Sequence, residues 1–202
     1  SIRQPASFCG LVGLKPTYSR VSRHGLIAYA SSFDQIGPLT NTVEDTALLL
    51  EVIAGKDKMD STSSSVQVDD YSSFIKPVKR KIAVLKDCLE REGLDVEVKQ
   101  KLESTIQQLQ DDGHEITYVS FPYLDFLVPT YYVLTTAEAS SNLARFDGVH
   151  YGYRIENPEN LEDTYIDSRT TAFGEEVKRR IMLGTFVLSA GYNDEYYKKA
   201  QQ

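Results

Sequence analysis

The sequence predicts an α/β fold, in which helices cover both faces of a mixed β-sheet. The clearest indication is the order strand, helix, strand with short connections between residues 81 and 121. Lys81–Leu85 has the composition of a short buried strand, and residues 116–121 are rich in β-branched and aromatic residues. Between the two strands, apolar side chains recur at helical spacing at Val98, Leu102, Ile106 and Leu109. Strands joined in this way pair in parallel, so we expect a parallel or mixed sheet.

Composition places the chain among ordinary globular proteins. Of the 202 residues, 41% are apolar and 25% are charged. The net charge of −7 argues against a broad surface for nucleic acid. The longest apolar run is far shorter than the ~20 residues of a membrane span, so no membrane contact is expected. Cys9 and Cys88 share no motif spacing, which favours a reduced protein in the cytoplasm over a disulfide.

The first forty residues are predicted to form turns, short strands and closely packed backbone. Gly10 and Gly13 suit positions where two backbones approach closely or where φ is positive. Thr42 is then a candidate N-cap for a helix that ends before Gly55. That helix is apolar on almost every side, so we expect it to be buried.

The polar, Ser-rich segment that follows suggests a boundary between subdomains. We therefore divide the chain into residues 1–56, a linker over residues 57–80, and a βαβ and helical part over residues 81–202. In the last part, a helix is expected over about 129–147, with Pro129 at its start. Residues 148–170 are rich in turn formers and tyrosine. A further helix should begin near Glu175 and be interrupted or kinked near Gly184 and Gly191.

Arg180 is the first residue whose surroundings suggest a function. On a helix its neighbours three and four positions away are mostly apolar, and Glu176 is the only charged one. An arginine in such a place either forms a structural ion pair or binds an anionic ligand. Arg179 has both Glu175 and Glu176 within reach and is expected at the surface. The residues alone leave both interpretations of Arg180 open.

Other candidate residues are less informative. Tyr131 and Tyr132 begin a helical stretch, where a tyrosine pair most often packs in the core with its hydroxyls at the edge. The three histidines are isolated, so no metal site is expected, and no phosphate-binding glycine motif occurs. Ser1 could be a nucleophile that uses its own α-amine, a nucleophile from a longer chain, or simply a terminal residue.

The opening residues favour one of these interpretations. Ser1–Ala6 (SIRQPA) and Cys9–Thr17 (CGLVGLKPT) resemble the second half of the signature of the amidase signature family. The similarity continues through Ala30–Pro38 and returns in Glu138–Gly148 and Lys178–Thr185. Within the family, the chain is most similar to the glutaminase subunits of tRNA-dependent amidotransferases. The fold implied is the amidase-signature core, here incomplete.

The resemblance implies a role for three residues. The family uses a Ser–cis-Ser–Lys triad, and its nucleophile corresponds to Ser1, which would attack the side-chain amide of glutamine to form an acyl ester and release ammonia. Tyr131 would contact the amino end of glutamine, and Arg180 would hold its α-carboxylate. Bidentate carboxylate binding needs the planar guanidinium of arginine.

The resemblance also implies partners. Other subunits of a heterotrimeric complex would use ATP and Mg²⁺, together with the ammonia, to convert Glu-tRNA(Gln) to Gln-tRNA(Gln). No cofactor is expected in this chain itself. The family's lysine, cis-serine and Gly-rich oxyanion segment precede the position of Ser1, so we expect this chain alone to be inactive. The alternatives are a stand-alone amidase of the same family and a non-catalytic scaffold or interaction module.

Overall fold

The computed structural model describes all 202 residues, which pack as two units. One unit contains Ser1–Phe74 and Thr130–Gln202, and the other contains Ile75–Pro129. The structure therefore divides the chain after residues 74 and 129, whereas the sequence suggested boundaries after residues 56 and 80.

The difference arises in the Ser-rich segment, where residues 57–74 belong to the first unit instead of forming a linker. Ser63 is buried, and its hydroxyl donates to the backbone oxygens of Asp57 and Asp60 at 2.9 and 2.7 Å. The Asp60 carboxylate in turn accepts a hydrogen bond from the backbone N–H of Arg23 at 2.9 Å. Short polar side chains that bond to nearby main chain order this segment, although its composition is typical of a flexible one.

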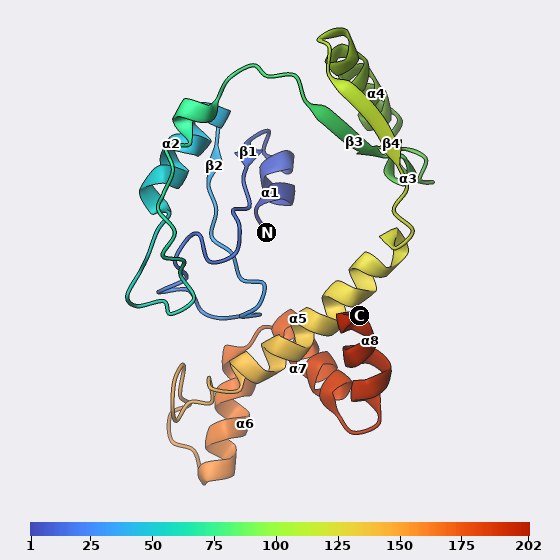
Figure 1. The fold of residues 1–202 in the computed structure, drawn as a ribbon. Coiled ribbons are helices and arrows are strands. Elements are labelled where there is room, and N and C mark those ends of the chain that lie inside the picture. The colour runs from blue at the N-terminus through green and yellow to red at the C-terminus, as the bar shows by residue number, and fades with distance from the viewer. The chain divides into compact units, whose positions relative to one another are not determined.

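The unit Ile75–Pro129 contains the strand–helix–strand arrangement that the sequence predicts (Figure 1). Strand β3 (Lys81–Leu85) pairs in parallel with β4 (Glu115–Val119), with Lys81 opposite Glu115. The short helix α3 (Lys86–Leu89), the longer α4 (Val96–Asp111) and a 3₁₀ turn (Leu124–Phe126) complete the unit. Asp95 caps α4 by accepting hydrogen bonds from the backbone N–H groups of Glu97 and Val98.

The N-terminal part of the other unit begins with helix α1 (Arg3–Phe8), which the sequence analysis did not predict. Its N-cap residue, Ile2, makes no side-chain capping bond, so the usual start signal is missing. Strands β1 (Val12–Gly13) and β2 (Leu39–Thr40) pair antiparallel. The expectation for the early glycines is confirmed: Gly10 has a φ of +65°, and a Cβ on Gly13 would lie 2.6 Å from that of Ala6.

Helix α2 (Val43–Ile53) follows and precedes a 3₁₀ turn (Ser72–Phe74). Thr42 caps it by accepting from the backbone N–H of Asp45 at 3.0 Å, as predicted. The sequence predicts that this helix is buried on almost every side, and that prediction is wrong. Ala47 and Leu50 are buried, but Leu48 and Val52 are 52% and 80% exposed, because only one face of the helix packs against the chain.

Three longer helices form the C-terminal part of the same unit: α5 (Leu127–Leu143), which belongs to this unit from Thr130 onwards, α6 (Leu161–Ala172) and α7 (Glu175–Leu188). A π-helical turn (Asn193–Lys198) and the short α8 (Lys199–Gln201) follow. Helix α6 was not predicted, because much of it lies within residues 148–170, which are rich in turn formers and tyrosine. Asn160 caps it by accepting from the backbone N–H of Asp163 at 2.9 Å, a spacing that could have indicated the helix.

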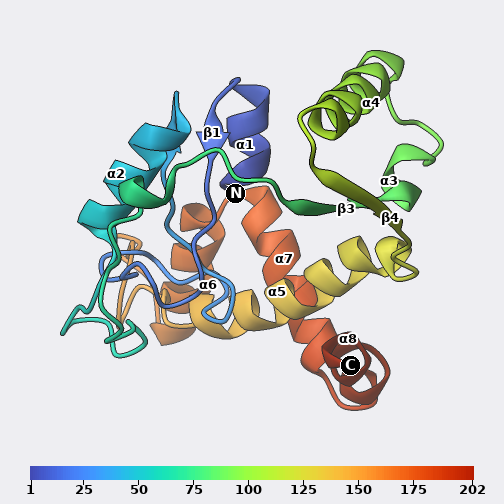
Figure 2. The ribbon, with the colours of Figure 1, turned by 45° about the horizontal axis from the view of Figure 1, so that its top comes forward.

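Helix α7 runs through Gly184 without a break, so the interruption expected there is wrong. The helix ends at Leu188, in agreement with the break expected near Gly191. A Cβ on Gly184 would lie 1.9 Å from the backbone oxygen of Thr136 on α5. The glycine therefore permits close contact between α5 and α7, which lie against each other in Figure 2. Thr136, which forms this contact, is fully buried, as is Ala139 on the same helix, and Val187 on α7 is 2% exposed.

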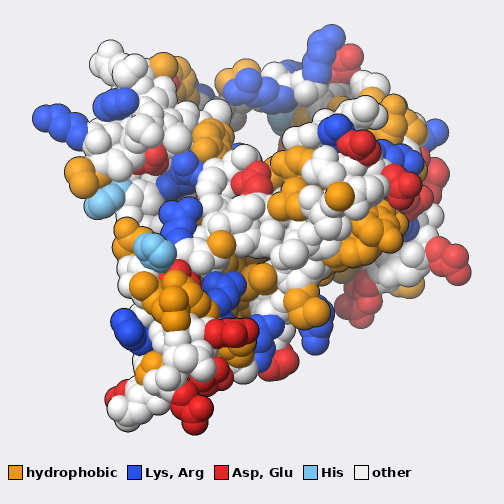
Figure 3. Space-filling model, turned by 90° about the horizontal axis from the view of Figure 1, so that it is seen from below, with side chains coloured by type: hydrophobic (Ala, Val, Ile, Leu, Met, Phe, Trp, Pro, Cys, Tyr) orange, Lys and Arg blue, Asp and Glu red, His pale blue; other side chains and the backbone are white.

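Apolar side chains also remain at the surface, and on the face shown in Figure 3 they gather in patches bordered by charged side chains. Both cysteines are free and exposed. None of the helices has the combination of length and apolar character that crossing a membrane requires.

Candidate active site

The centre of the candidate site is Arg180, which lies in the second turn of α7 with its side chain 25% exposed. Its Nε donates to Glu176 Oε1 at 2.8 Å, one turn earlier on the same helix. Its Nη1 donates to the hydroxyl oxygen of Tyr29 at 2.9 Å. Tyr29 belongs to a loop distant in sequence, so this contact exists only because the chain folds back on itself.

Aromatic rings surround the guanidinium group. Its central carbon lies 5.8 Å from the ring centroid of Tyr29 and 5.6 Å from that of Tyr132. The rings of Tyr131 and Tyr132, at the start of α5, meet edge to face with centroids 5.4 Å apart. The structure therefore places Arg180 among three tyrosines from two other segments of the chain.

These neighbours raise the pKa of Arg180 above its ordinary value. The hydrogen bond with Tyr29 contributes most, followed by that with Glu176, while burial acts in the opposite direction and Tyr131 adds a smaller increase. The hydrogen bond from Arg180 lowers the pKa of the Glu176 carboxyl. A cation in this setting stays charged over the whole physiological range of pH.

The structure thus brings Tyr131 and Arg180 to one place, as the two proposed substrate-binding residues require. It does not connect Ser1 with them: Ser1 is exposed, precedes α1, and shares no hydrogen bond or ion pair with either residue. Its neighbour Ile2 is 8% exposed and anchors the start of α1. Arg179 is 73% exposed in its ion pair with Glu176, which confirms its expected position at the surface.

Tyr29 is the residue that the sequence analysis missed. It stands between Ala28 and Ala30 in a segment of small and apolar residues. A single tyrosine in such surroundings is a weak signal, because aromatic residues are common in cores. Only the contact with Arg180 distinguishes it.

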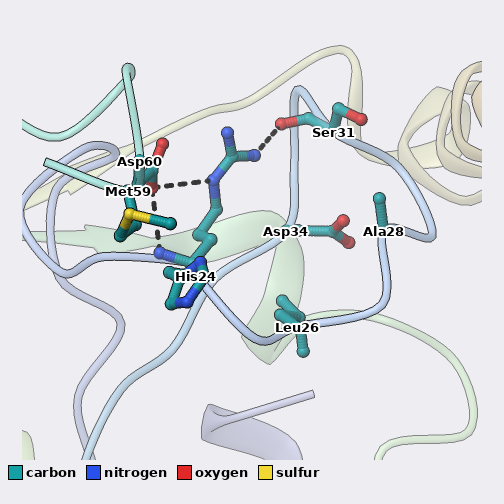
Figure 4. A pocket seen from close by; sticks show the side chains of 8 residues that line it. His24, Leu26, Ala28, Ser31, Asp34, Met59 and Asp60 are labelled. Carbon is teal, nitrogen blue, oxygen red and sulfur yellow. Dashed lines mark hydrogen bonds and ion pairs between the residues drawn. The ribbon is translucent and has the colours of Figure 1, made fainter. Parts of the chain in front are cut away.

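A second charged cluster surrounds a cavity of about 160 Å³ lined by Arg23, His24, Asp34 and Asp60, among others (Figure 4). Arg23 Nε lies 3.7 Å from Asp60 Oδ2, and its other nitrogens donate to the backbone oxygen of Ser31 and, at 3.0 Å, to the hydroxyl of Thr62. Both terminal nitrogens of Arg23 thus bond to the protein, and the cluster links loops of the first unit. No three metal-binding side chains gather anywhere in the chain.

Comparison with known proteins relates this chain to enzymes that act on amides. A family model described as Amidase matches residues 1–202. The chain is 58% identical over 204 residues to the A-type subunit of glutamyl-tRNA(Gln) amidotransferase from Bacillus velezensis, and 59% identical over 204 residues to that from Koribacter versatilis. Both alignments include 100% of this chain but only 42% of the relative, so the chain spans about two fifths of each relative's length.

Solved structures show the same relationship. The crystal structure of the corresponding glutamyl-tRNA(Gln) amidotransferase subunit from Thermotoga maritima matches with a TM-score of 0.66 and 38% identity, covering 99% of this chain and 39% of that chain. Native peptide amidase from Stenotrophomonas maltophilia matches with a TM-score of 0.71 and 26% identity. The match covers 100% of this chain and 41% of the peptide amidase. These matches confirm the predicted α/β fold and the resemblance. Because the family model covers all 202 residues, the chain belongs to the amidase family.

Proposed function

We propose that this chain forms part of the glutaminase subunit of a tRNA-dependent amidotransferase. The observation that carries the proposal is the guanidinium group of Arg180, which lies among Tyr29, Tyr131 and Tyr132. Arg180 donates from Nε to Glu176 and from Nη1 to Tyr29. A guanidinium group has five N–H donors, so others remain that could bind a carboxylate. The names of the close relatives support the same function.

In this proposal the substrate is glutamine, which has both an α-carboxylate and a side-chain amide. Arg180 binds the α-carboxylate, and Tyr131 contacts the amino end. The two residues hold the free amino-acid end, which leaves the side-chain amide free to reach the nucleophile. Fixing the substrate in this way lowers the entropic cost of the reaction.

Ser1 would then attack the amide carbon of the glutamine side chain. Its proton would pass to the family's lysine through the cis-serine. The lysine would return this proton to the amide nitrogen as the tetrahedral intermediate collapses, so that the C–N bond breaks and ammonia leaves. Water hydrolyses the remaining glutamyl ester to glutamate and regenerates the serine hydroxyl. Other subunits of the complex would use the ammonia, with ATP and Mg²⁺, to convert Glu-tRNA(Gln) to Gln-tRNA(Gln) in the cytoplasm.

The test is the substitution Arg180→Ala in a full-length amidotransferase that carries this sequence. We expect KM for glutamine to rise about 100-fold, since a charge-assisted bidentate contact is lost, while hydrolysis of a small amide without a carboxylate is retained. Arg179→Ala is the matched control, because Arg179 is the exposed neighbour on the same helix. An equal loss of activity on both substrates would contradict the carboxylate site.

A second candidate function is that of a stand-alone amidase, favoured by the match to peptide amidase. Such an enzyme acts without ammonia transfer and would not require a free amino-acid end on its substrate. Under this alternative, Arg180→Ala would change the hydrolysis of glutamine and of a blocked peptide amide to the same extent. The ratio of the two activities therefore separates the candidates.

A further inference from the structure

The loop Ala28–Asp34, which we call the strap, is held by hydrogen bonds within the loop and by hydrogen bonds to helix α5. At one end, the Asp34 carboxylate accepts hydrogen bonds from the backbone N–H groups of Tyr29 and Ala30 at 3.0 and 3.1 Å. On helix α5, Asn142 Nδ2 donates to the backbone oxygen of Tyr29 at 3.2 Å, and Glu138 Oε2 accepts from the backbone N–H of Ser32 at 2.9 Å. The backbone of Tyr29 is therefore bonded on both its N–H and its C=O side.

This anchoring directs the Tyr29 side chain to Arg180. The hydroxyl oxygen of Tyr29 accepts a hydrogen bond from Arg180 Nη1 at 2.9 Å. Because this oxygen is the acceptor, the hydroxyl hydrogen remains available to donate to a second group.

The remaining support of Arg180 is weaker. Glu176 holds the Nε side, but its carboxylate is 55% exposed and also pairs with Arg179. Exposed ion pairs of this kind contribute little and do not fix one geometry. The hydrogen bond with Tyr29 is therefore the contact that best defines the orientation of the guanidinium group.

We propose that Tyr29 is a positioning residue, which orients the Arg180 guanidinium for a carboxylate ligand and is itself presented by the strap. The inference rests on the proposed function, since the ligand is taken to be the α-carboxylate of glutamine. It concerns only how tightly glutamine binds. The cleavage of the amide bond involves other groups, so its rate at saturation should not change.

The test is Tyr29→Phe in a full-length amidotransferase, which removes one oxygen and retains the ring. We expect KM for glutamine to increase about tenfold, since a hydrogen bond to a charged group is lost, with kcat nearly unchanged. Activity with ammonium as the nitrogen donor should not change. The matched control is Tyr71→Phe, because the Tyr71 hydroxyl also accepts from an arginine, Arg20 Nε at 2.6 Å, away from the site.

A double-mutant cycle separates positioning from a general effect on folding. In an Arg180→Ala background, Tyr29→Phe should cause no further change in KM. An unchanged KM in Tyr29→Phe alone, an additive effect in the double variant, or an equal increase in Tyr71→Phe would each overturn the inference. If Arg180→Ala itself left KM for glutamine unchanged, the proposed function would fail instead, so the two failures can be distinguished.

Discussion

Substituting Gly184 with alanine should both destabilise the protein and disturb the proposed carboxylate site around Arg180. The added Cβ would lie 1.9 Å from the backbone oxygen of Thr136 and 2.9 Å from Ser140 Cβ. Ordinary contacts begin near 3.4 Å, so α5 and α7 would have to separate by roughly 1.5 Å. The oxygen belongs to a helix backbone and cannot rotate away as a flexible side chain could.

The magnitude follows from two opposing effects. Overpacking a close contact typically costs about 1–3 kcal/mol. We take a cost of about 3 kcal/mol here, because the added Cβ would meet a backbone atom that cannot move aside. Alanine is better than glycine within a helix by about 1 kcal/mol. We therefore expect a net loss of about 2 kcal/mol in the free energy of unfolding. Arg180 lies one turn before Gly184, so the same displacement should lengthen its 2.9 Å hydrogen bond with Tyr29 and raise KM for glutamine.

The measurement is urea unfolding of the full-length protein followed by circular dichroism, together with glutamine kinetics. Gly174→Ala serves as the control, because Gly174 precedes the same helix and a Cβ there would meet no atom within 4 Å. We expect its stability to change by less than about 1 kcal/mol. If Gly184→Ala were as stable as this control, the close approach of the two backbones would be refuted.

Two further predictions concern Asp60 and Ser1. Hydrogen bonds from the backbone N–H of Arg23 and from the side chain and backbone of Thr62 lower the pKa of Asp60 to about 2. Its folded pKa is thus below the unfolded one, and the stability it adds is present above about pH 4 and lost as the pH falls towards 2. The thermal midpoints of the wild type and of Asp60→Asn should therefore become more similar as the pH falls over that range. A difference between the two midpoints that stays constant with pH would contradict the lowered pKa of Asp60. A glutamine-like electrophile should label Ser1 in the full-length protein, and labelling that persists in Ser1→Ala would eliminate it as the nucleophile.

Local patterns account for much of the fold. Residues 81–85 form the predicted strand and Thr42 acts as the predicted helix cap, because these signals operate between residues close in sequence. The expected burial of the strand is wrong, since none of its five residues is buried. Helix α1 was missed because its N-cap, Ile2, makes no side-chain capping bond. The break predicted at Gly184 was wrong, since a glycine that weakens an isolated helix can also serve close packing with a neighbouring helix.

The amino-acid sequence was sufficient to identify the family of this protein, because the residues around Ser1 and the later matching segments form one consistent pattern. It also indicated Arg180 as an arginine with mostly apolar neighbours on its own helix. The groups that surround that arginine could be known only from the folded chain. Tyr29 and Arg180 are separated by 151 positions, and their hydrogen bond depends on the strap, α5 and α7 packing together. No periodicity along the chain encodes such a contact, because it results from which surfaces are buried against one another.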